Sequence, residues 1–218
     1  MRRLADGLYL LRGFPPNAIN GYLMGDVIVD AATRHGGRRI LRQLRGHTVS
    51  AHALTHVHPD HQGASRHICT ALDIPLWCGS ADAPAMEKGT FEQPRHWLNR
   101  LIEWAWAGPA HQVARRLVEG DEVAGFRVLE VPGHSPGHLA YWREADHVLV
   151  LGDVLNNMDV ATGVRGLREP KRIFTPDPAR NRESARSLAA LEPELVCFGH
   201  GPPLGDGRKF VDFVAGLP

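Results

Sequence analysis

Four side chains of the kinds that bind metal ions lie within one short segment, His56–His61, which reads His-Val-His-Pro-Asp-His. Side chains alternate between the two sides of an extended chain, so His56 and His58 point the same way and can reach one metal ion. A proline then turns the chain, and Asp60 and His61 can reach a second metal ion nearby. Neutral imidazole and carboxylate are ligands that suit Zn²⁺, and also iron or manganese.

Three further residues of ligand type each follow a predicted strand. They are His134 after the strand at 126–131, Asp153 after the strand at 147–151, and His200 after the strand at 195–198. A glycine adjoins each of them, which lets the backbone approach a metal ion closely. A single histidine at a strand end is more often a hydrogen-bonded residue than a ligand, but the whole set has no packing explanation. The sequence therefore predicts two ligand sets, which is what a dinuclear metal site needs.

The elements that must position these residues alternate along the chain. The first half has predicted strands at 8–11, 18–24, 27–30, 49–55 and 75–78, and predicted helices at 36–46, 61–72 and 94–107. The second half has predicted strands at 111–118, 126–131, 139–143, 147–151 and 195–198, helices at 178–191 and 208–214, and an irregular stretch at 156–175. Strands grouped in each half, with helices between them, predict an α/β fold of two mixed sheets with helices outside. No linker divides the chain, so we expect a single domain over residues 1–218.

The composition narrows the classes of function. The chain has 25 Lys and Arg against 24 Asp and Glu, and this balance argues against a nucleic-acid partner. No apolar run approaches the roughly 18–20 residues of a membrane helix, and no apolar stretch of a secretory signal follows the first residues. The three cysteines (Cys69, Cys78 and Cys197) read as reduced, packed thiols. We therefore expect a cytoplasmic protein that acts on a small molecule without a membrane partner.

The order of these motifs resembles that of the metallo-β-lactamase-fold hydrolase superfamily, whose members carry a His-x-His-x-Asp-His signature. The similar segments are 29–30, 55–63, 133–138, 152–153 and 199–201, in the order of the family. The resemblance implies a four-layer αβ/βα sandwich with two Zn²⁺ ions at one edge, although iron or manganese would also suit the ligands.

The resemblance also implies a role for each site residue. One metal ion would be held by His56, His58 and His134, the other by Asp60, His61 and His200, and Asp153 would bridge the two. Asp30 is similar to an aspartate at a strand end that supports the family's ligands from behind. His138 is not a ligand in the family pattern, and a structural hydrogen bond is its expected role.

Such a site predicts hydrolysis of an ester-like bond. Two cations lower the pKa of a shared water from 15.7 toward about 7, and the resulting bridging hydroxide attacks the substrate carbonyl. The cations also stabilise the oxyanion that forms. Asp60 would be the catalytic residue that orients the water and moves its proton to the leaving group. Ser135 is expected to be a turn residue, because no Gly-x-Ser-x-Gly motif surrounds it.

The bond that is cleaved remains open among several branches of the family. The glyoxalase II-like (hydroxyacylglutathione hydrolase-like) thioesterases keep all seven ligand types, but this chain lacks their Cys-Gly-Lys-Phe-like segment after Asp153 and ends before their C-terminal helical domain. The lactonases of acyl-homoserine lactones have a similar dinuclear ligand pattern, but this chain has no match for the tyrosine in their loop after the bridging aspartate. The main expectation is thus a zinc-dependent thioesterase or lactonase. The alternatives are a persulfide dioxygenase-like enzyme with one iron, a phosphodiesterase, a β-lactamase-like activity, and an inactive metal-binding module, although Asp153 counts against a β-lactamase.

Two other segments bear on the substrate pocket. Trp97, Leu101 and Trp104 share one face of a predicted helix, with Leu98 and Trp106 beside it. This stripe favours a surface that packs into the core or faces a second copy of the chain, rather than a lid over the substrate. The sequence therefore leaves open whether the chain forms a homodimer. A basic segment at 165–182 is expected to be mostly a solvated face, from which one or two arginines could hold a substrate carboxylate or phosphate.

Overall fold

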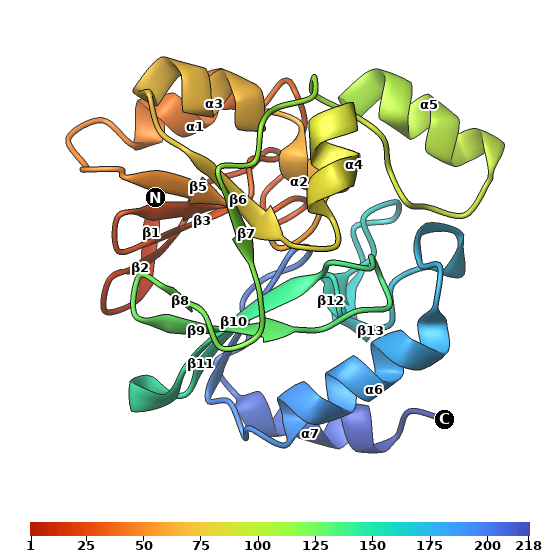
Figure 1. Ribbon diagram of the computed structural model, residues 1–218. Helices are drawn as coiled ribbons and strands as arrows, with labels where there is room; N and C mark the ends of the chain where they lie inside the picture. Colours follow the sequence, from red (N-terminus) through yellow and green to blue (C-terminus); the bar gives the residue numbers. More distant parts are fainter.

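Two large β-sheets lie face to face in the computed structural model, which describes residues 1–218 (Figure 1). The first sheet has seven strands in chain order: β1 (Arg2–Ala5), β2 (Leu8–Leu10), β3 (Tyr22–Met24), β4 (Val27–Val29), β5 (Ala51–Ala53), β6 (Leu76–Gly79) and β7 (Arg115–Leu117). The strands β1 to β4 pair antiparallel, and β4 to β7 pair parallel. The tight turn between β3 and β4 lies at Gly25 and Asp26, as the sequence predicted.

The second sheet is mixed as well. Its order is β14 (Leu195–Phe198), β11 (Val148–Gly152), β10 (Leu139–Arg143), β9 (Phe126–Glu130) and β8 (Glu122–Val123). Only the β11–β14 pair is parallel. A separate antiparallel hairpin of β12 (Asn156–Met158) and β13 (Arg165–Arg168) lies at the end of the sandwich that carries the ligands.

Helices cover the outer face of each sheet. On the first sheet lie α1 (Gly37–Gln43) and α3 (Ser65–Leu72), and on the second lie α6 (Pro178–Ala189) and α7 (Gly207–Ala215). The remaining helices are α2 (Pro59–Gln62), α4 (Ala83–Lys88) and α5 (Trp97–Trp106), with two short 3₁₀ turns at Glu144–Asp146 and Arg172–Phe174. The layers are therefore helix, sheet, sheet, helix, and the predicted fold class is confirmed.

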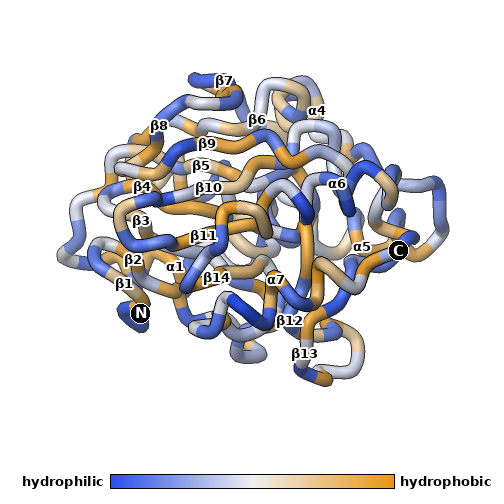
Figure 2. Tube along the Cα trace, turned by 90° about the horizontal axis from the view of Figure 1, so that it is seen from below, coloured by the Kyte–Doolittle hydropathy of each residue, from blue (hydrophilic) through white to orange (hydrophobic).

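Alternation along the strands explains the layering. On β11, Val148 and Val150 pack into the core between the sheets, while Leu149 and Leu151 pack under α6 and α7. Because both faces of this strand are buried, its sequence is apolar throughout rather than alternating with polar residues. Figure 2 shows the same apolar character along β11 and β14 in the interior.

The structure differs from the sequence prediction in its less periodic parts. The edge strand β1 and the helix α4 were not predicted, and the stretch at 156–175, expected to be irregular, contains the β12–β13 hairpin. The predicted helix at 61–72 is split into α2 and α3, with α2 beginning at Pro59 inside the metal-binding motif. A proline at the first position of a helix costs nothing, since its missing N–H would have no partner there. None of the helices combines the length and apolar character that crossing a bilayer requires.

Candidate metal centre

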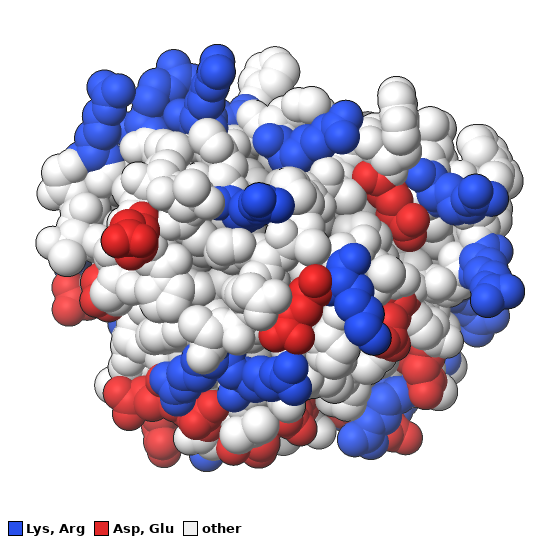
Figure 3. Space-filling model, turned by 45° about the horizontal axis from the view of Figure 1, so that its top comes forward, with Lys and Arg blue, Asp and Glu red and all other residues white.

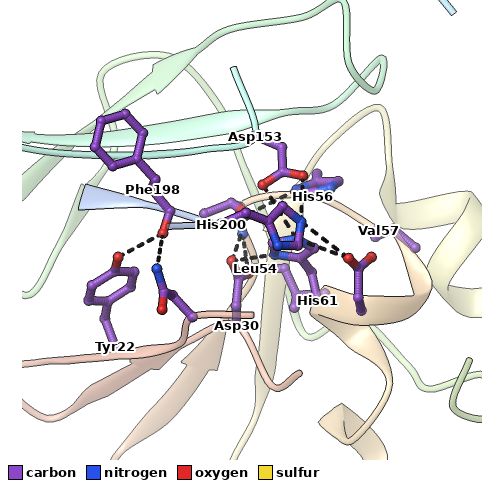
Figure 4. A network of polar contacts seen from close by, with 12 residues as sticks. Tyr22, Asp30, Leu54, His56, Val57, His61, Asp153, Phe198 and His200 are labelled. Atoms are coloured by element: carbon purple, nitrogen blue, oxygen red, sulfur yellow. Dashed lines mark hydrogen bonds and ion pairs between the residues drawn. The ribbon is translucent and has the colours of Figure 1, made fainter. Parts of the chain in front are cut away.

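The seven predicted ligands come from four segments that follow strands at one edge of the sandwich. His56 and His58 follow β5, Asp60 and His61 lie on α2, His134 follows β9, Asp153 follows β11, and His200 follows β14. Figure 4 shows His56, His61, Asp153 and His200 pointing toward one another from these separate segments. Residues up to 144 positions apart, from His56 to His200, thus meet at one place because the strand ends share this edge.

The ligand atoms form three overlapping groups, each with its atoms within 4.8 Å of one another. The groups are His56, His58 and His134; His56, His61 and Asp153; and Asp60, His61 and His200. The first and third are the two sets that the resemblance implied, and the second joins them through Asp153. The structure therefore brings together every residue that the sequence singled out as a ligand.

In four of the ligand rings, those of His56, His61, His134 and His200, Nδ1 has a supporting partner, which leaves Nε2 for the centre. His61 donates from Nδ1 to Asp30 at 2.8 Å, and Nδ1 of His134 lies 3.1 Å from the Thr175 hydroxyl. The Nε2 atoms of four rings are buried without any hydrogen-bond partner, and these rings are His56, His58, His61 and His134. Unpartnered buried nitrogen atoms are costly, and a cation among them removes that cost. The residues present therefore fit a metal centre.

Two carboxylates face the imidazole groups. Asp153 lies 3.0 Å from Nε2 of His200, 3.5 Å from that of His61 and 3.6 Å from that of His134. Asp60 Oδ2 lies 3.2 Å from Nε2 of His200. Burial opposes their ionisation, but the neighbouring histidines hold the pKa of both carboxyl groups below the usual range. Both aspartates therefore carry the negative charge that a divalent cation needs.

The histidines of the two ligand sets differ in the direction in which their pKa values are shifted. Burial lowers the pKa of His58 to about 4 and the pKa values of His56 and His134 well below the usual value. Burial also disfavours a charge on His200, but Asp153 and Asp60 outweigh it and raise its pKa to about 10. His61 has its pKa raised in the same way, by the same two aspartates and Asp30. Without a metal ion, the second set thus holds protons that the first set does not.

Asp30 and His138 support the ligands as expected. Asp30 is buried at the end of β4 and accepts hydrogen bonds at 2.8 Å from the backbone N–H and hydroxyl of Thr55 and from His61. It thereby ties β4 to both ends of the metal-binding motif. His138 accepts a hydrogen bond from the backbone N–H of Asp153 at 3.3 Å, and burial lowers its pKa to about 3, so it stays neutral.

Asp82 is a supporting residue that the sequence analysis missed. Its buried carboxylate accepts hydrogen bonds from the N–H of Val57 at 3.0 Å, the hydroxyl of Ser135 at 2.8 Å and the N–H of Gly137 at 2.6 Å. It therefore joins the loop that holds His56 and His58 to the loop that holds His134. The one signal in the sequence is an aspartate directly before Ala-Pro, which is typical of a helix N-cap, yet Asp82 makes no side-chain cap of α4.

Two glycines leave room for the ligands, as their position beside Asp153 and His200 suggested. A Cβ on Gly199 would overlap the carboxylate of Asp153 and lie 2.7 Å from the ring of His61. Gly152 has a φ of +58°, and a Cβ there would meet His138 and Thr55. The close approach requires glycine at both positions, and at Gly152 the left-handed backbone conformation favours glycine as well.

A cavity of about 370 Å³ opens beside the ligands. His58, Asp60, His134, Asp153 and His200 line its floor. Its walls are mainly apolar and come from α5, the β12–β13 hairpin and the turn at Arg172–Phe174: Leu98, Ile102, Trp106, Met158, Val160, Ile173 and Phe174. The volume is in the range of pockets for small organic ligands.

The tryptophan-rich helix does not pack into the core, so the expectation of a core-packing stripe is wrong. Trp97 and Trp104 are 70% and 73% exposed, and Leu101 is 49% exposed. The opposite face of α5, with Leu98 and Trp106, lines the cavity. The helix is apolar on both faces, so its sequence pattern could not tell which face is covered. Whether the exposed face joins two copies of the chain stays a prediction.

Four basic side chains of the segment at 165–182 form ion pairs with carboxylates in or near it. Arg182 forms a two-pronged ion pair with Glu169 at 2.6 and 3.1 Å. Arg168 and Lys171 line the cavity, but both contact Asp159, at 3.5 and 3.4 Å. Their charges are therefore largely compensated on this side of the cavity.

The layered α/β fold and the buried cluster of histidines and aspartates at one edge of the sheets are together typical of a class of metal-binding enzymes. The family model described as the metallo-beta-lactamase superfamily matches residues 15–200 of the chain. The chain belongs to this superfamily, as the motifs predicted. Relatives in it are named metallo-hydrolases and hydroxyacylglutathione hydrolases, so the prediction of a metallo-hydrolase superfamily is confirmed.

Relatives of known sequence and structure resemble the chain over different lengths. A probable metallo-hydrolase of Bacillus subtilis (strain 168), YflN, is 29% identical over 206 residues, which cover 84% of this chain and 78% of that protein. A hydroxyacylglutathione hydrolase of Bdellovibrio bacteriovorus is 26% identical over 154 residues, and the match covers 69% of this chain and 48% of that protein. The chain thus spans about half the length of this hydrolase. The crystal structure of TTHA1623 in a di-iron-bound form is 31% identical, with a TM-score of 0.62 and coverage of 92% of this chain and 91% of the other.

Proposed function

We propose that this chain is a dinuclear metal hydrolase that cleaves an ester-like bond, namely a thioester or a lactone, with zinc as its metal. One observation carries the proposal: four buried imidazole Nε2 atoms without partners face two ionised carboxylates at the floor of a small-molecule cavity. In this proposal His56, His58 and His134 hold one metal ion, Asp60, His61 and His200 hold the other, and Asp153 bridges them. The di-iron form of TTHA1623 supports a two-metal site and makes iron the main alternative to zinc.

When bound, the metal ions supply a water of lowered pKa and a Lewis acid for the carbonyl oxygen of the substrate. The chain's own residues do the rest. Asp60 lines the cavity and stays ionised, so its carboxylate can orient a water molecule and carry its proton toward the leaving group. Asp30 and Asp82 hold the loops that carry the ligands, so little reorganisation is needed during the reaction.

The walls of the cavity support a substrate with an apolar acyl group. Leu98 and Ile102 on one side and Phe174 on another offer apolar surface within the same cavity as Asp60. Arg168 and Lys171 line the same cavity and both contact Asp159. The acyl group of the substrate therefore does not need a negative charge to pair with them. The hydroxyacylglutathione hydrolases among the relatives favour a thioester over a lactone.

The test combines metal analysis with a substrate panel. Protein purified without chelator is analysed for zinc, iron and manganese, and then assayed with acyl thioesters, lactones, a chromogenic β-lactam and bis-p-nitrophenyl phosphate. Two metal equivalents with thioester or lactone hydrolysis support the proposal. One tightly held iron with oxygen consumption on a persulfide replaces the proposal with a dioxygenase, and protein without metal overturns both. Turnover of only the β-lactam or the phosphodiester overturns the assigned bond.

A further inference from the structure

The outer face of α5 carries an apolar stripe that no part of the fold covers. Trp97, Leu101 and Trp104 are spaced four and three residues apart, so they lie on one face of the helix, and all three are exposed. Arg100 is exposed on the same face, three residues after Trp97 and four before Trp104. Glu103, the one acidic residue of α5, falls outside this face. Exposed apolar side chains gathered on one face mark a contact surface.

The outer face of α1 carries a stripe of arginines with the same spacing. Arg38, Arg42 and, just after the helix, Arg45 are exposed, and none of them forms an ion pair. Residues 31–59 contain no acidic residue, and α1, α3 and α5 together have five arginines against one glutamate. The net charge of the whole chain is only +1, so positive charge is concentrated on these helices.

The two stripes lie on the same side of the molecule. The backbone N–H of Arg34 donates to the carbonyl of Trp106 at 2.9 Å, and Nε2 of His35 lies 3.2 Å from the carbonyl oxygen of Ala105. These contacts join the end of α5 to the segment just before α1, and Figure 1 shows α1, α3 and α5 along one side of the molecule. In Figure 3 the Lys and Arg side chains gather at the upper left, over the region of α1 and α3, without an acidic side chain among them. A flat partner that approaches this side can therefore meet the tryptophans and the arginines together.

The charge on this face favours an anionic lipid surface over a second copy of the chain. A two-fold pairing of identical faces would place arginines against arginines, with no acidic side chain in either stripe. Two tryptophans that are 70% and 73% exposed add at most about 350 Å² to an interface, whereas a stable dimer buries about 800 Å² on each partner. An anionic bilayer attracts the arginines and accepts the apolar side chains at the same time.

The residue types on α5 are those found where proteins meet the head groups of a lipid bilayer. Tryptophan combines an apolar ring with a polar N–H, and it is enriched at the boundary between hydrocarbon and water. The expectation of no membrane partner came from the lack of a long apolar run, which only a spanning helix needs. A helix that lies in the plane of the interface needs one apolar face with basic residues beside it.

We propose that the face formed by α5 and α1 docks on the surface of an anionic lipid bilayer. Trp97, Leu101 and Trp104 insert at the level of the lipid head groups, and the arginines of α1 lie against the lipid phosphates. Leu98 and Trp106, on the inner face of α5, line the ligand cavity, so the docked helix lies between the lipid and that cavity. Docking of this kind does not depend on which bond the enzyme cleaves.

Vesicle binding of the metal-loaded protein is the first test, and the exposed tryptophans report on it directly. Of the five tryptophans in the chain, Trp97 and Trp104 are the two that are mostly exposed, so their emission should shift to shorter wavelength on insertion. We expect affinity for vesicles with about 30% phosphatidylglycerol to be about tenfold higher than for pure phosphatidylcholine, and to fall as salt rises. Equal affinity for both kinds of vesicle, or no binding to either, overturns the proposal.

The second test removes the tryptophans and measures binding by co-sedimentation with the anionic vesicles. In the double variant Trp97→Gln and Trp104→Gln, affinity should fall about tenfold or more, because the apolar contact with lipid is lost. The control is Val118→Gln and Val164→Gln, which replaces two exposed apolar side chains on other elements and should change affinity by about twofold at most. An equal loss in both double variants overturns the assigned face.

The third test removes positive charge from α1. In the double variant Arg38→Gln and Arg42→Gln, affinity for anionic vesicles should fall about tenfold and become less sensitive to salt. The control is Arg127→Gln and Arg208→Gln, which removes the same charge from exposed arginines of β9 and α7 that form no ion pair, and should change affinity by about twofold at most. An equal loss in both would show that only net charge matters, and the docking face would not stand.

The other possible occupants are tested without lipid. Light scattering compares the mass of the wild type with that of the tryptophan variant, and a dimer that only the variant loses means that a second copy covers this face, which overturns the lipid proposal. A single-stranded oligonucleotide presents phosphates without a lipid phase, and tighter binding of it than of anionic vesicles overturns the proposal as well. A monomer that binds anionic vesicles through both stripes supports it, even if the protein hydrolyses no thioester or lactone.

Discussion

The metal centre and the wall of the cavity beside it are built in opposite ways. The centre consists mainly of buried side chains supported by other buried residues: Asp30 accepts a hydrogen bond from the ring of His61, and Asp82 holds two of the loops that carry the ligands. The wall consists of α5 and the β12–β13 hairpin, in which large apolar residues such as Trp97 and Val164 remain exposed. A side chain of α5, Asn99, links it to the other side of the cavity by donating to the carbonyl of Ile173 at 2.6 Å.

This difference separates two tasks. The centre determines which reaction can occur, and that requires ligands held within tenths of an ångström. The wall determines which substrate enters, and a surface with fewer fixed contacts can change without disturbing the ligands. We therefore expect substitutions at the centre to lower kcat or metal content, and substitutions in the wall to change KM and the choice of substrate.

The largest effect is expected for Asp60→Asn. The substitution keeps the shape of the side chain but removes the negative charge that faces the cavity, so kcat should fall about a thousandfold. Stopped-flow or steady-state hydrolysis of the best substrate measures the change. Because Asp60 is also a proposed ligand, metal content must be measured on the same sample. Full metal content with an unchanged kcat would remove Asp60 from the mechanism.

A second test concerns the pH dependence of metal binding within the centre. In the metal-free protein the pKa of His58 is about 4, so the first set is neutral from pH 6 to 8 and its metal affinity should change little. The pKa of His200 is about 10, so a metal ion must displace its proton throughout this range. His61, whose pKa is also raised well above its usual value, must lose its proton as well. Affinity of the second set should therefore fall about a hundredfold per pH unit on acidification, or about ten-thousandfold from pH 8 to pH 6.

Competition with a chromophoric chelator measures these affinities. His134→Ala disables the first set and His200→Ala the second, so each variant reports on the set that remains. A steep dependence in the His134→Ala protein and a flat one in the His200→Ala protein are expected. The same slope in both would mean that the two sets do not differ in bound protons.

The raised pKa of His200 also affects the stability of the metal-free protein. The folded protein binds its proton more tightly than the unfolded chain, so this contribution to stability is fully present below about pH 6.5 and is lost as the pH rises toward 10.

Asp82→Asn should have an intermediate effect, because it disturbs the centre without touching a ligand. Val57 and Gly137 donate to different oxygens of Asp82, and the amide keeps only one oxygen, so one of these two N–H groups faces an NH2 group and the two ligand loops lose their common acceptor. We expect metal affinity to fall about tenfold to a hundredfold and the free energy of unfolding to fall by about 1–3 kcal/mol. Asp73→Asn, on an exposed left-handed residue that asparagine tolerates, is the control. Unchanged metal affinity in the Asp82 variant would limit this residue to stabilising the fold.

The sequence predicted the centre far better than the wall, for a physical reason. The His56–His61 motif directly follows a strand, and His134, Asp153 and His200 each follow a strand and have a glycine beside them, so local spacing contained the information. Asp82 was missed because its partners lie 25, 53 and 55 residues away and its local pattern indicated only a helix cap. The β12–β13 hairpin was missed because Asn156–Met158 and Arg165–Arg168 show no alternation of apolar and polar residues.

The smallest effect is expected for substitutions in the wall of the cavity, at two leucines of α5. Leu98 lines the first cavity, whereas Leu101, one turn away on the same helix, is 49% exposed and does not. Leu98→Ala removes apolar contact with the acyl group, so KM should rise about fivefold for an octanoyl thioester and about twofold at most for an acetyl thioester, with kcat unchanged. Leu101→Ala should leave both KM values unchanged and can alter only an association of the exposed face of α5, which light scattering detects. If the two variants behave alike toward both thioesters, α5 does not select the acyl group. A fall in kcat for Leu98→Ala would instead show that wall and centre are mechanically coupled, and the separation of tasks between them would not hold.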